Sequence, residues 1–139
     1  MSDPTQTRGY RLQNPLNIRI SDNQWLGKVT PSSDPDFEQF DIPEHGVRAA
    51  AKIIVGYFKV YGLSTIDQII GRWAPATENN CVAYCNTVSQ KTGYDPGQSL
   101  NVLDPTTLTS LITGMMNVEI GGIPYAYSQI ENGVAGALE

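Results

Sequence analysis

Carboxyl groups are the side chains of this sequence with the most capacity for chemistry. The 139 residues include fourteen Asp and Glu but only one histidine, His45, and two cysteines. A nucleophilic triad or dyad would have to use His45, and no recognisable nucleophile motif accompanies it. Cys81 and Cys85 have the one-turn spacing of a shared metal, yet a zinc site needs three or four ligands at motif spacing. We therefore expect two free thiols, no metal and no cofactor.

Glu119 is the acid whose place in the sequence best suits proton donation. It lies at the C-terminal end of an apolar helical stretch that includes Leu111 and Met115, just before Gly121-Gly122. The negative end of a helix dipole and apolar neighbours both disfavour a charged carboxyl group. A glycosidase or lytic transglycosylase needs such an acid beside the scissile bond. The alternative interpretation is an exposed helix-end glutamate.

Two further glutamates, Glu44 and Glu78, fall in the first turns of expected helices. The helix dipole favours a charged carboxylate there, and for Glu44 a structural role is the better interpretation. Glu78 suits a charged base or stabiliser, so it is the candidate second catalytic residue. The other acids fall in polar loops, at the termini or at helix caps.

Aromatic rings and amides are the side chains that hold sugars, by stacking and by hydrogen bonding. The candidate glycan-binding residues are Asn14, Asn17, Trp25, Asn79, Tyr84 and Tyr125. Trp73 could serve in the same way, but it fits the apolar stripe of a helix, and a core position is the preferred interpretation. Asn-Pro and Asn-Asn pairs are equally suited to turns and caps.

The elements that must position these residues are mainly helical. Apolar residues recur at three–four spacing from Val47 to Tyr61, and Gly62 follows, which predicts a helix of about 18 residues ending there. Four more helix starts are predicted from capping signals: Ser64 with Asp67, Thr77, Asp104 with Pro105, and Ser128 with Glu131.

The N-terminal third lacks a helical period. Residues 1–9 are predicted to be a flexible arm before a single domain over 10–139. Alternation over 16–20, with a returning segment 24–29, predicts a β-hairpin, and 37–40 a short third strand. The expected fold class is mainly α, in an α+β arrangement. Lysozyme-like folds have this arrangement, with a β-wing and a helical lobe flanking a carbohydrate cleft.

Charge and hydropathy exclude several classes of function. Nine Lys and Arg against fourteen Asp and Glu give a net charge of −5, which disfavours nucleic acid and anionic membranes as partners. No apolar run approaches the ~18 residues of a membrane span. The N-terminus lacks the apolar segment of a secretory signal peptide.

Several segments together resemble a family of small bacteriophage and prophage proteins. They are Arg8-Gly9, Asn14-Pro15-Leu16-Asn17-Ile18-Arg19, Trp25-Leu26-Gly27 and the run VEIGGIPY around Glu119. The N-terminus of that family reads RGxRNNNPGNIR followed by WxG, and the resemblance extends over nearly the whole chain. It implies a phage structural or virion protein, with a lysozyme-like or lytic role attributed to some members. Leu16 and Ile120 stand where relatives carry Gly and Asn.

The same segments are similar in kind to those of lysozyme-superfamily peptidoglycan hydrolases. Residues 14–18 resemble the strand that lines the cleft of those enzymes, and residues 74–88, with Asn79 and Tyr84, resemble the later segment of the glycan groove. The enzymes place their catalytic glutamate before the strand. Here the helix ending in Glu119 would supply it from the C-terminal side, as in a circular permutation.

Two hypotheses for the function follow. The first is a phage-derived muramidase or lytic transglycosylase that cleaves peptidoglycan glycan strands with Glu119 as its general acid. The alternative is a non-catalytic virion protein that assembles with other virion proteins or binds glycan. Either would be found in the virion or in the host cytoplasm, and delivery to the periplasm would need a route other than a signal peptide.

Overall fold

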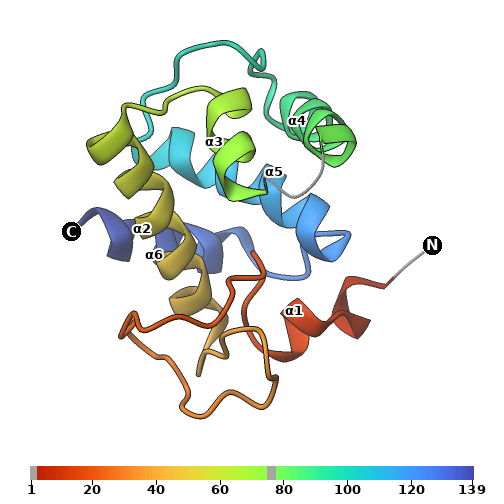
Figure 1. Ribbon diagram of the computed structural model, residues 1–139, viewed down its shortest axis with the longest axis vertical. Coiled ribbons are helices and arrows are strands. Elements are labelled where there is room, and N and C mark those ends of the chain that lie inside the picture. Colours follow the sequence, from red (N-terminus) through yellow and green to blue (C-terminus); the bar gives the residue numbers. More distant parts are fainter. Residues whose placement is uncertain (1–2, 75–77) are drawn as a thin grey trace.

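The computed structural model describes residues 3–74 and 78–139, apart from the side chains of residues 78–81. Helices make up most of the described chain (Figure 1). They are the 3-10 helix η1 (Pro4–Gln6) and the α-helices α1 (Arg8–Arg11), α2 (Pro43–Tyr61), α3 (Ile66–Trp73), α4 (Glu78–Thr92), α5 (Pro105–Ile120) and α6 (Tyr127–Leu138). The expectation of a mainly helical fold is confirmed.

Helices α2 and α5 have boundaries set by local chemistry. α2 begins at Pro43 and ends before Gly62, whose φ of 69° suits glycine. α5 begins after Asp104, whose carboxylate accepts a hydrogen bond from the Thr107 N–H at 2.9 Å. Both boundaries confirm the predicted caps.

The capping boxes of α3 and α6 differ from those predicted. In α3 the box is formed by Thr65 and Gln68 in place of Ser64 and Asp67: Thr65 Oγ1 accepts from the Gln68 N–H at 3.1 Å. In α6 a glutamine again takes part, because Gln129 Oε1 accepts from the backbone N–H three residues earlier at 3.0 Å. Several short polar residues stand at the start of each of these helices, so the sequence does not show which of them is the N-cap.

The predicted N-terminal β-hairpin does not form in the described residues. Two isolated antiparallel bridges occur instead, Arg19 with Phe37 and Lys28 with Phe40. The fully buried side chain of Asn14 explains the interruption. Its Oδ1 accepts from the Ile18 N–H at 3.0 Å, and its Nδ2 donates to the Ile18 carbonyl at 2.9 Å. The Ile18 N–H and the Glu38 carbonyl therefore bond the Asn14 amide instead of each other, which limits the pairing of these segments to a bridge.

Helix α5 forms the centre of the packing. α5 contacts α4 and α6, while α2 packs against α6 and α3 packs against α4 (Figure 1). Gly133 allows the close approach of α6 to α2, since a Cβ there would lie 2.7 Å from the Glu44 carbonyl oxygen. The fully buried side chains of α5 are Leu108, Leu111, Ile112, Met115, Met116 and Ile120. This apolar helix therefore anchors the half-buried Glu119 at its C-terminal end.

The N-terminal segment lies against that same end of α5. Helix α1 contacts α5, and a Cβ on the buried Gly9 would lie 2.7 Å from both Asn17 Oδ1 and Ile120 Cγ2. Glycine at this position thus permits the chain to approach the site closely. The mobility of residues 1–9 in solution and the single domain over 10–139 stay predictions.

In the described ranges, no helix taken singly has the length and apolar character to cross a bilayer. Helices α2 and α3 taken together meet that requirement, but they are bent by 112° relative to one another.

Candidate functional site

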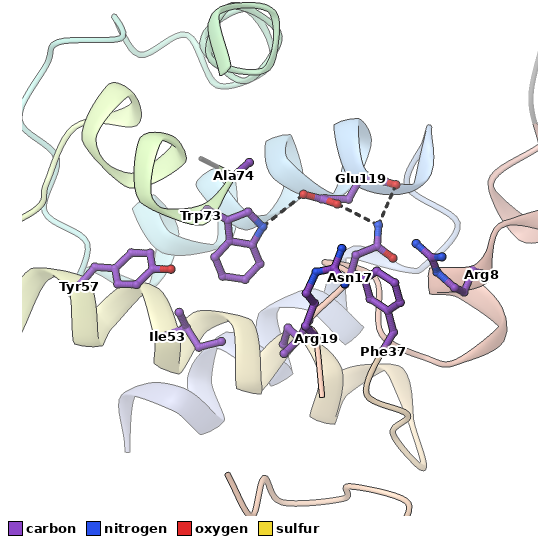
Figure 2. A pocket seen from close by; sticks show the side chains of 10 residues that line it. Arg8, Asn17, Arg19, Phe37, Ile53, Tyr57, Trp73, Ala74 and Glu119 are labelled. Carbon is purple, nitrogen blue, oxygen red and sulfur yellow. Dashed lines mark hydrogen bonds between the residues drawn. The ribbon is translucent and has the colours of Figure 1, made fainter. Parts of the chain in front are cut away.

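Among the described residues, three side chains from three separate segments donate hydrogen bonds to the carboxylate of Glu119. Asn17 Nδ2 donates to Oε1 at 2.9 Å. Tyr84 Oη donates to Oε2 at 2.9 Å and Trp73 Nε1 donates to the same atom at 3.2 Å. Figure 2 shows Trp73 and Asn17 approaching Glu119 from opposite sides. The site therefore joins the loop after α1 with the helices α3, α4 and α5.

Asn17 holds its position through an unusual backbone conformation. Its φ is 55°, in the left-handed region, which asparagine adopts more readily than most other residues. From there Nδ2 reaches both the carboxylate and, at 3.1 Å, the backbone carbonyl of Glu119. One amide thus satisfies a carbonyl group at the C-terminus of α5 and orients the acid.

Tyr84 is a donor that keeps its proton. Its side chain is buried, and burial together with the adjacent Glu119 carboxylate raises the pKa of the Tyr84 hydroxyl far above its usual range. The hydroxyl therefore stays protonated at physiological pH and donates to Glu119 Oε2.

All three of these partners donate, which bears on the chemistry available to Glu119. The indole N–H of Trp73 cannot accept a hydrogen bond, and Asn17 Nδ2 faces two oxygens. A charged carboxylate satisfies these donors without needing a proton of its own. As placed, the Glu119 carboxyl group can accept hydrogen bonds from sugar hydroxyls or stabilise positive charge.

Glu119 borders a pocket of about 460 Å³ that is open to solvent. Its lining includes aromatic, apolar and charged side chains, namely Arg8, Asn17, Ile18, Arg19, Phe37, Ile53, Tyr57, Trp73, Ala74 and Glu119 (Figure 2). A second pocket of about 390 Å³ is lined by Ala83, Tyr84, Thr87 and Val118, and it shares Ala74 and Glu119 with the first. Glu119 thus lines both hollows.

The structure brings together only some of the predicted site residues. Asn17 and Tyr84 contact Glu119, whereas the fully buried Asn14 bonds backbone groups, including the Glu38 carbonyl at 2.9 Å. The side chains of Glu78 and Asn79 lie outside the described residues.

The two remaining aromatic candidates lie away from this pocket. Trp25 packs against the hydrophobic core and does not line the pocket. Tyr125 stacks on Tyr10 with ring centroids 5.6 Å apart, beside a different hollow. Burial raises the pKa of the Tyr125 hydroxyl above its usual range. Neither residue contacts Glu119 in the described structure.

Most of the residues that line the pocket are not among the candidate site residues. Trp73 is half-buried, and its indole N–H donates a hydrogen bond to Glu119. Its helical spacing alone suggests a core residue. Arg8, Arg19 and Phe37 also line the pocket. Both arginines fall in the segments that resemble the phage family, which is the one feature of the sequence that could have indicated them.

The sequence is similar to a phage protein. It is 42% identical over 137 residues to Protein P5 of Pseudoalteromonas phage PM2, an alignment that covers 94% of this chain and 84% of that protein. A scan against protein-family models gave no match. The expected kinship with bacteriophage proteins is confirmed.

Proposed function

Because the chain belongs to the family of Protein P5 of Pseudoalteromonas phage PM2, we propose that it is a component of a phage particle that binds cell-wall glycan. The binding site is the pair of hollows that meet at Glu119. Peptidoglycan strands and other virion proteins are its partners. In this proposal the fold is a lysozyme-like helical domain whose site glutamate comes from the C-terminal side, as in a circular permutation.

The observation that carries the glycan part is the set of three donors around Glu119. A carboxylate fixed by Asn17, Trp73 and Tyr84 is a pre-oriented acceptor for sugar hydroxyls. Trp73 and Tyr57 supply aromatic surface in the same pocket. A carbohydrate site combines these features, with rings to stack on the sugar faces and fixed polar groups for the hydroxyls.

The virion part rests on relationship, since the similarity to a phage protein extends over nearly the whole chain. It is tested by purifying particles of the source phage on a density gradient and quantifying the protein by mass spectrometry. We expect a constant number of copies per particle across the gradient peak. Protein confined to the lysate and absent from the particles would contradict it.

The glycan part is tested by cosedimentation with purified peptidoglycan sacculi. Glu119→Gln should weaken binding about tenfold, since it removes the charge from an acceptor that three donors hold in place. Glu131→Gln, at an exposed position in α6, is the matched control and should bind as the wild type does. Equal binding by both variants would exclude the pocket as the glycan site.

Peptidoglycan cleavage is the second candidate function, favoured by the place of Glu119 between two hollows. No second carboxylate lines either hollow in the part of the chain that is described. This arrangement favours a one-acid transglycosylase, in which a hydroxyl of the substrate itself attacks, over a two-acid hydrolase. Glu78 is the residue to examine if a second acid acts.

Cleavage is tested by mass spectrometry of the muropeptides released from sacculi. If the protein is a transglycosylase, 1,6-anhydro products appear with the wild type and disappear with Glu119→Gln. Products with reducing ends would indicate a hydrolase. A wild type that binds sacculi but releases nothing between pH ~4 and ~8 is a binding protein, because this range spans the ordinary titration of carboxylic acids and histidine.

A further inference from the structure

The pocket holds two guanidinium groups that nothing in the proposed function has used. Arg8, in α1, and Arg19, in the following loop, both line it. Their Cζ atoms lie 3.7 Å and 4.8 Å from the centroid of the Phe37 ring. In Figure 2 the Phe37 ring lies between the two arginine side chains, on the side of the pocket away from Tyr57.

Stacking on Phe37 leaves the hydrogen-bonding edges of both arginines available. A guanidinium meets an aromatic ring with its flat face, while its N–H groups point outward in its own plane. The ion pairs found in the described residues are Lys28 with Glu38 and His45 with Asp41, and neither involves these arginines. The nearby Glu119 carboxylate is held by Asn17, Trp73 and Tyr84.

Local backbone structure fixes Arg19 and Phe37 beside one another. Residues 19 and 37 form one of the isolated antiparallel bridges. The Glu38 N–H donates to the Ile18 carbonyl at 2.9 Å, and the Ile20 N–H donates to the Asp36 carbonyl at 3.0 Å. The rigid pairing therefore pre-orients part of the cationic pair before any ligand arrives.

From this geometry we infer that the pocket takes a carboxylate-bearing carbohydrate, with the carboxylate bound by Arg8 and Arg19. This inference rests on the proposed glycan-binding function and names the chemistry of its ligand. Two guanidinium groups and one carboxylate give the pocket lining a charge of +1, in a protein whose net charge is −5. The in-plane N–H forks match a carboxylate, and Trp73 and Glu119 lie across the pocket for the neutral part of the sugar (Figure 2).

The test compares two tetrasaccharides that differ in their carboxylates. One alternates N-acetylglucosamine with N-acetylmuramic acid and carries no stem peptide, so that its lactyl carboxylates are free as in glycan stripped of peptide. The other is chitotetraose, which is neutral. Isothermal titration of the full chain should show the acidic sugar binding about tenfold more tightly, as expected for one charge-assisted interaction. The preference should shrink as salt is raised.

Variants locate the preference within the pocket. Arg8→Gln and Arg19→Gln should each reduce the ratio of the affinity for the acidic sugar to that for chitotetraose, and their folding is checked by circular dichroism. Arg11→Gln is the matched control. Arg11 also belongs to α1, but it is exposed and borders a different hollow.

Each outcome separates this inference from the function on which it rests. Equal affinity for both sugars, or a preference unchanged in Arg8→Gln and Arg19→Gln, would overturn the inference and leave glycan binding standing. Failure of the folded wild type to bind either sugar would overturn both. Binding to phosphatidylglycerol vesicles, but not to phosphatidylcholine vesicles or sugars, would assign the arginines to lipid phosphate instead.

Discussion

Asn17 spans the C-terminal end of helix α5, with its side-chain amide on two oxygens of Glu119, a residue 102 positions further along the chain. A single N–H₂ group contacts both the backbone carbonyl and the carboxylate of this residue. The end of the helix and the orientation of the acid therefore depend on the same side chain. Changes at Asn17 should affect stability and binding together.

Substitutions of Asn17 distinguish the contribution of its side chain to stability from that of its backbone conformation. Asn17→Ala loses the hydrogen bonds to Glu119. It also places an alanine at φ 55°, a left-handed conformation that alanine adopts less readily than asparagine. It should lower the free energy of unfolding by about 2 kcal/mol in urea titrations. Asn17→Gly adopts the same φ freely, so it should be the less destabilised of the two. An alanine variant as stable as the wild type would contradict this account.

Gly9 tests how closely the N-terminal segment approaches the site. Gly9→Ala would place a Cβ 2.7 Å from Asn17 Oδ1 and Ile120 Cγ2, so it should destabilise the protein and weaken glycan binding. Gly56→Ala is the control, since it is also helical and has no atom within 4 Å of the added Cβ. Helix propensity alone should stabilise that variant by about 0.5–1 kcal/mol. If the thermal unfolding temperature of Gly9→Ala rises as that of Gly56→Ala does, the close approach is refuted.

Alkaline pH should destabilise the protein through Tyr84. Burial and the Glu119 carboxylate raise the pKa of its hydroxyl in the folded state, whereas in the unfolded chain it titrates near about 10. Above that pH the unfolded chain releases a proton that the folded chain keeps. Stability is thus full below about pH 10 and falls as pH rises.

The measurement is the urea midpoint between pH ~9 and ~11, the range around the unfolded tyrosine pKa. Tyr84→Phe should lose stability less steeply than the wild type. Tyr127→Phe, which removes a tyrosine that is 53% exposed, is the control. Parallel slopes for the wild type and Tyr84→Phe would show that another group dominates.

Lys28 and Glu38 form an ion pair within the segment that joins α1 to α2. Their side-chain atoms lie 3.0 Å apart, and only 1% of the Glu38 side chain is exposed. Lys28→Met should destabilise the protein by about 3 kcal/mol, because it leaves a buried carboxylate unpaired. Adding Glu38→Leu to that variant should restore most of the loss. A double variant no more stable than Lys28→Met in chemical unfolding would contradict this.

The sequence predicts best what local chemistry decides. Asp104 and Gly62 bound their helices as predicted, because a cap depends on neighbours within four residues. Glu119 could be singled out from its own helix. The predicted β-hairpin is wrong because it depends on a distant residue. The fully buried Asn14 side chain bonds backbone groups of Ile18 and of Glu38, which is 24 residues away in sequence.

Asn17 and Tyr84 are among the predicted candidates, but the side chains that complete the pocket depend on contacts between distant segments. Trp73 has helical spacing that suits a core residue and a pocket residue equally, and only the folded chain places its indole on Oε2. Arg8 and Arg19 come together through Phe37, a contact that no periodicity encodes. Asn17 and Glu119 are 102 residues apart in the sequence, and they meet only when the helices have packed together.

The most direct test of glycan binding at Glu119 uses the two tryptophan indole N–H signals in a ¹⁵N–¹H spectrum of the full chain. Trp73 Nε1 contacts Glu119 in the pocket, whereas Trp25 lies outside it, so the protein contains its own control. Trp73→Phe assigns the two signals. Titration with the tetrasaccharide of N-acetylglucosamine and N-acetylmuramic acid should shift the Trp73 signal and leave that of Trp25 in place. A saturating titration that shifts only Trp25, or neither signal, would contradict glycan binding at Glu119.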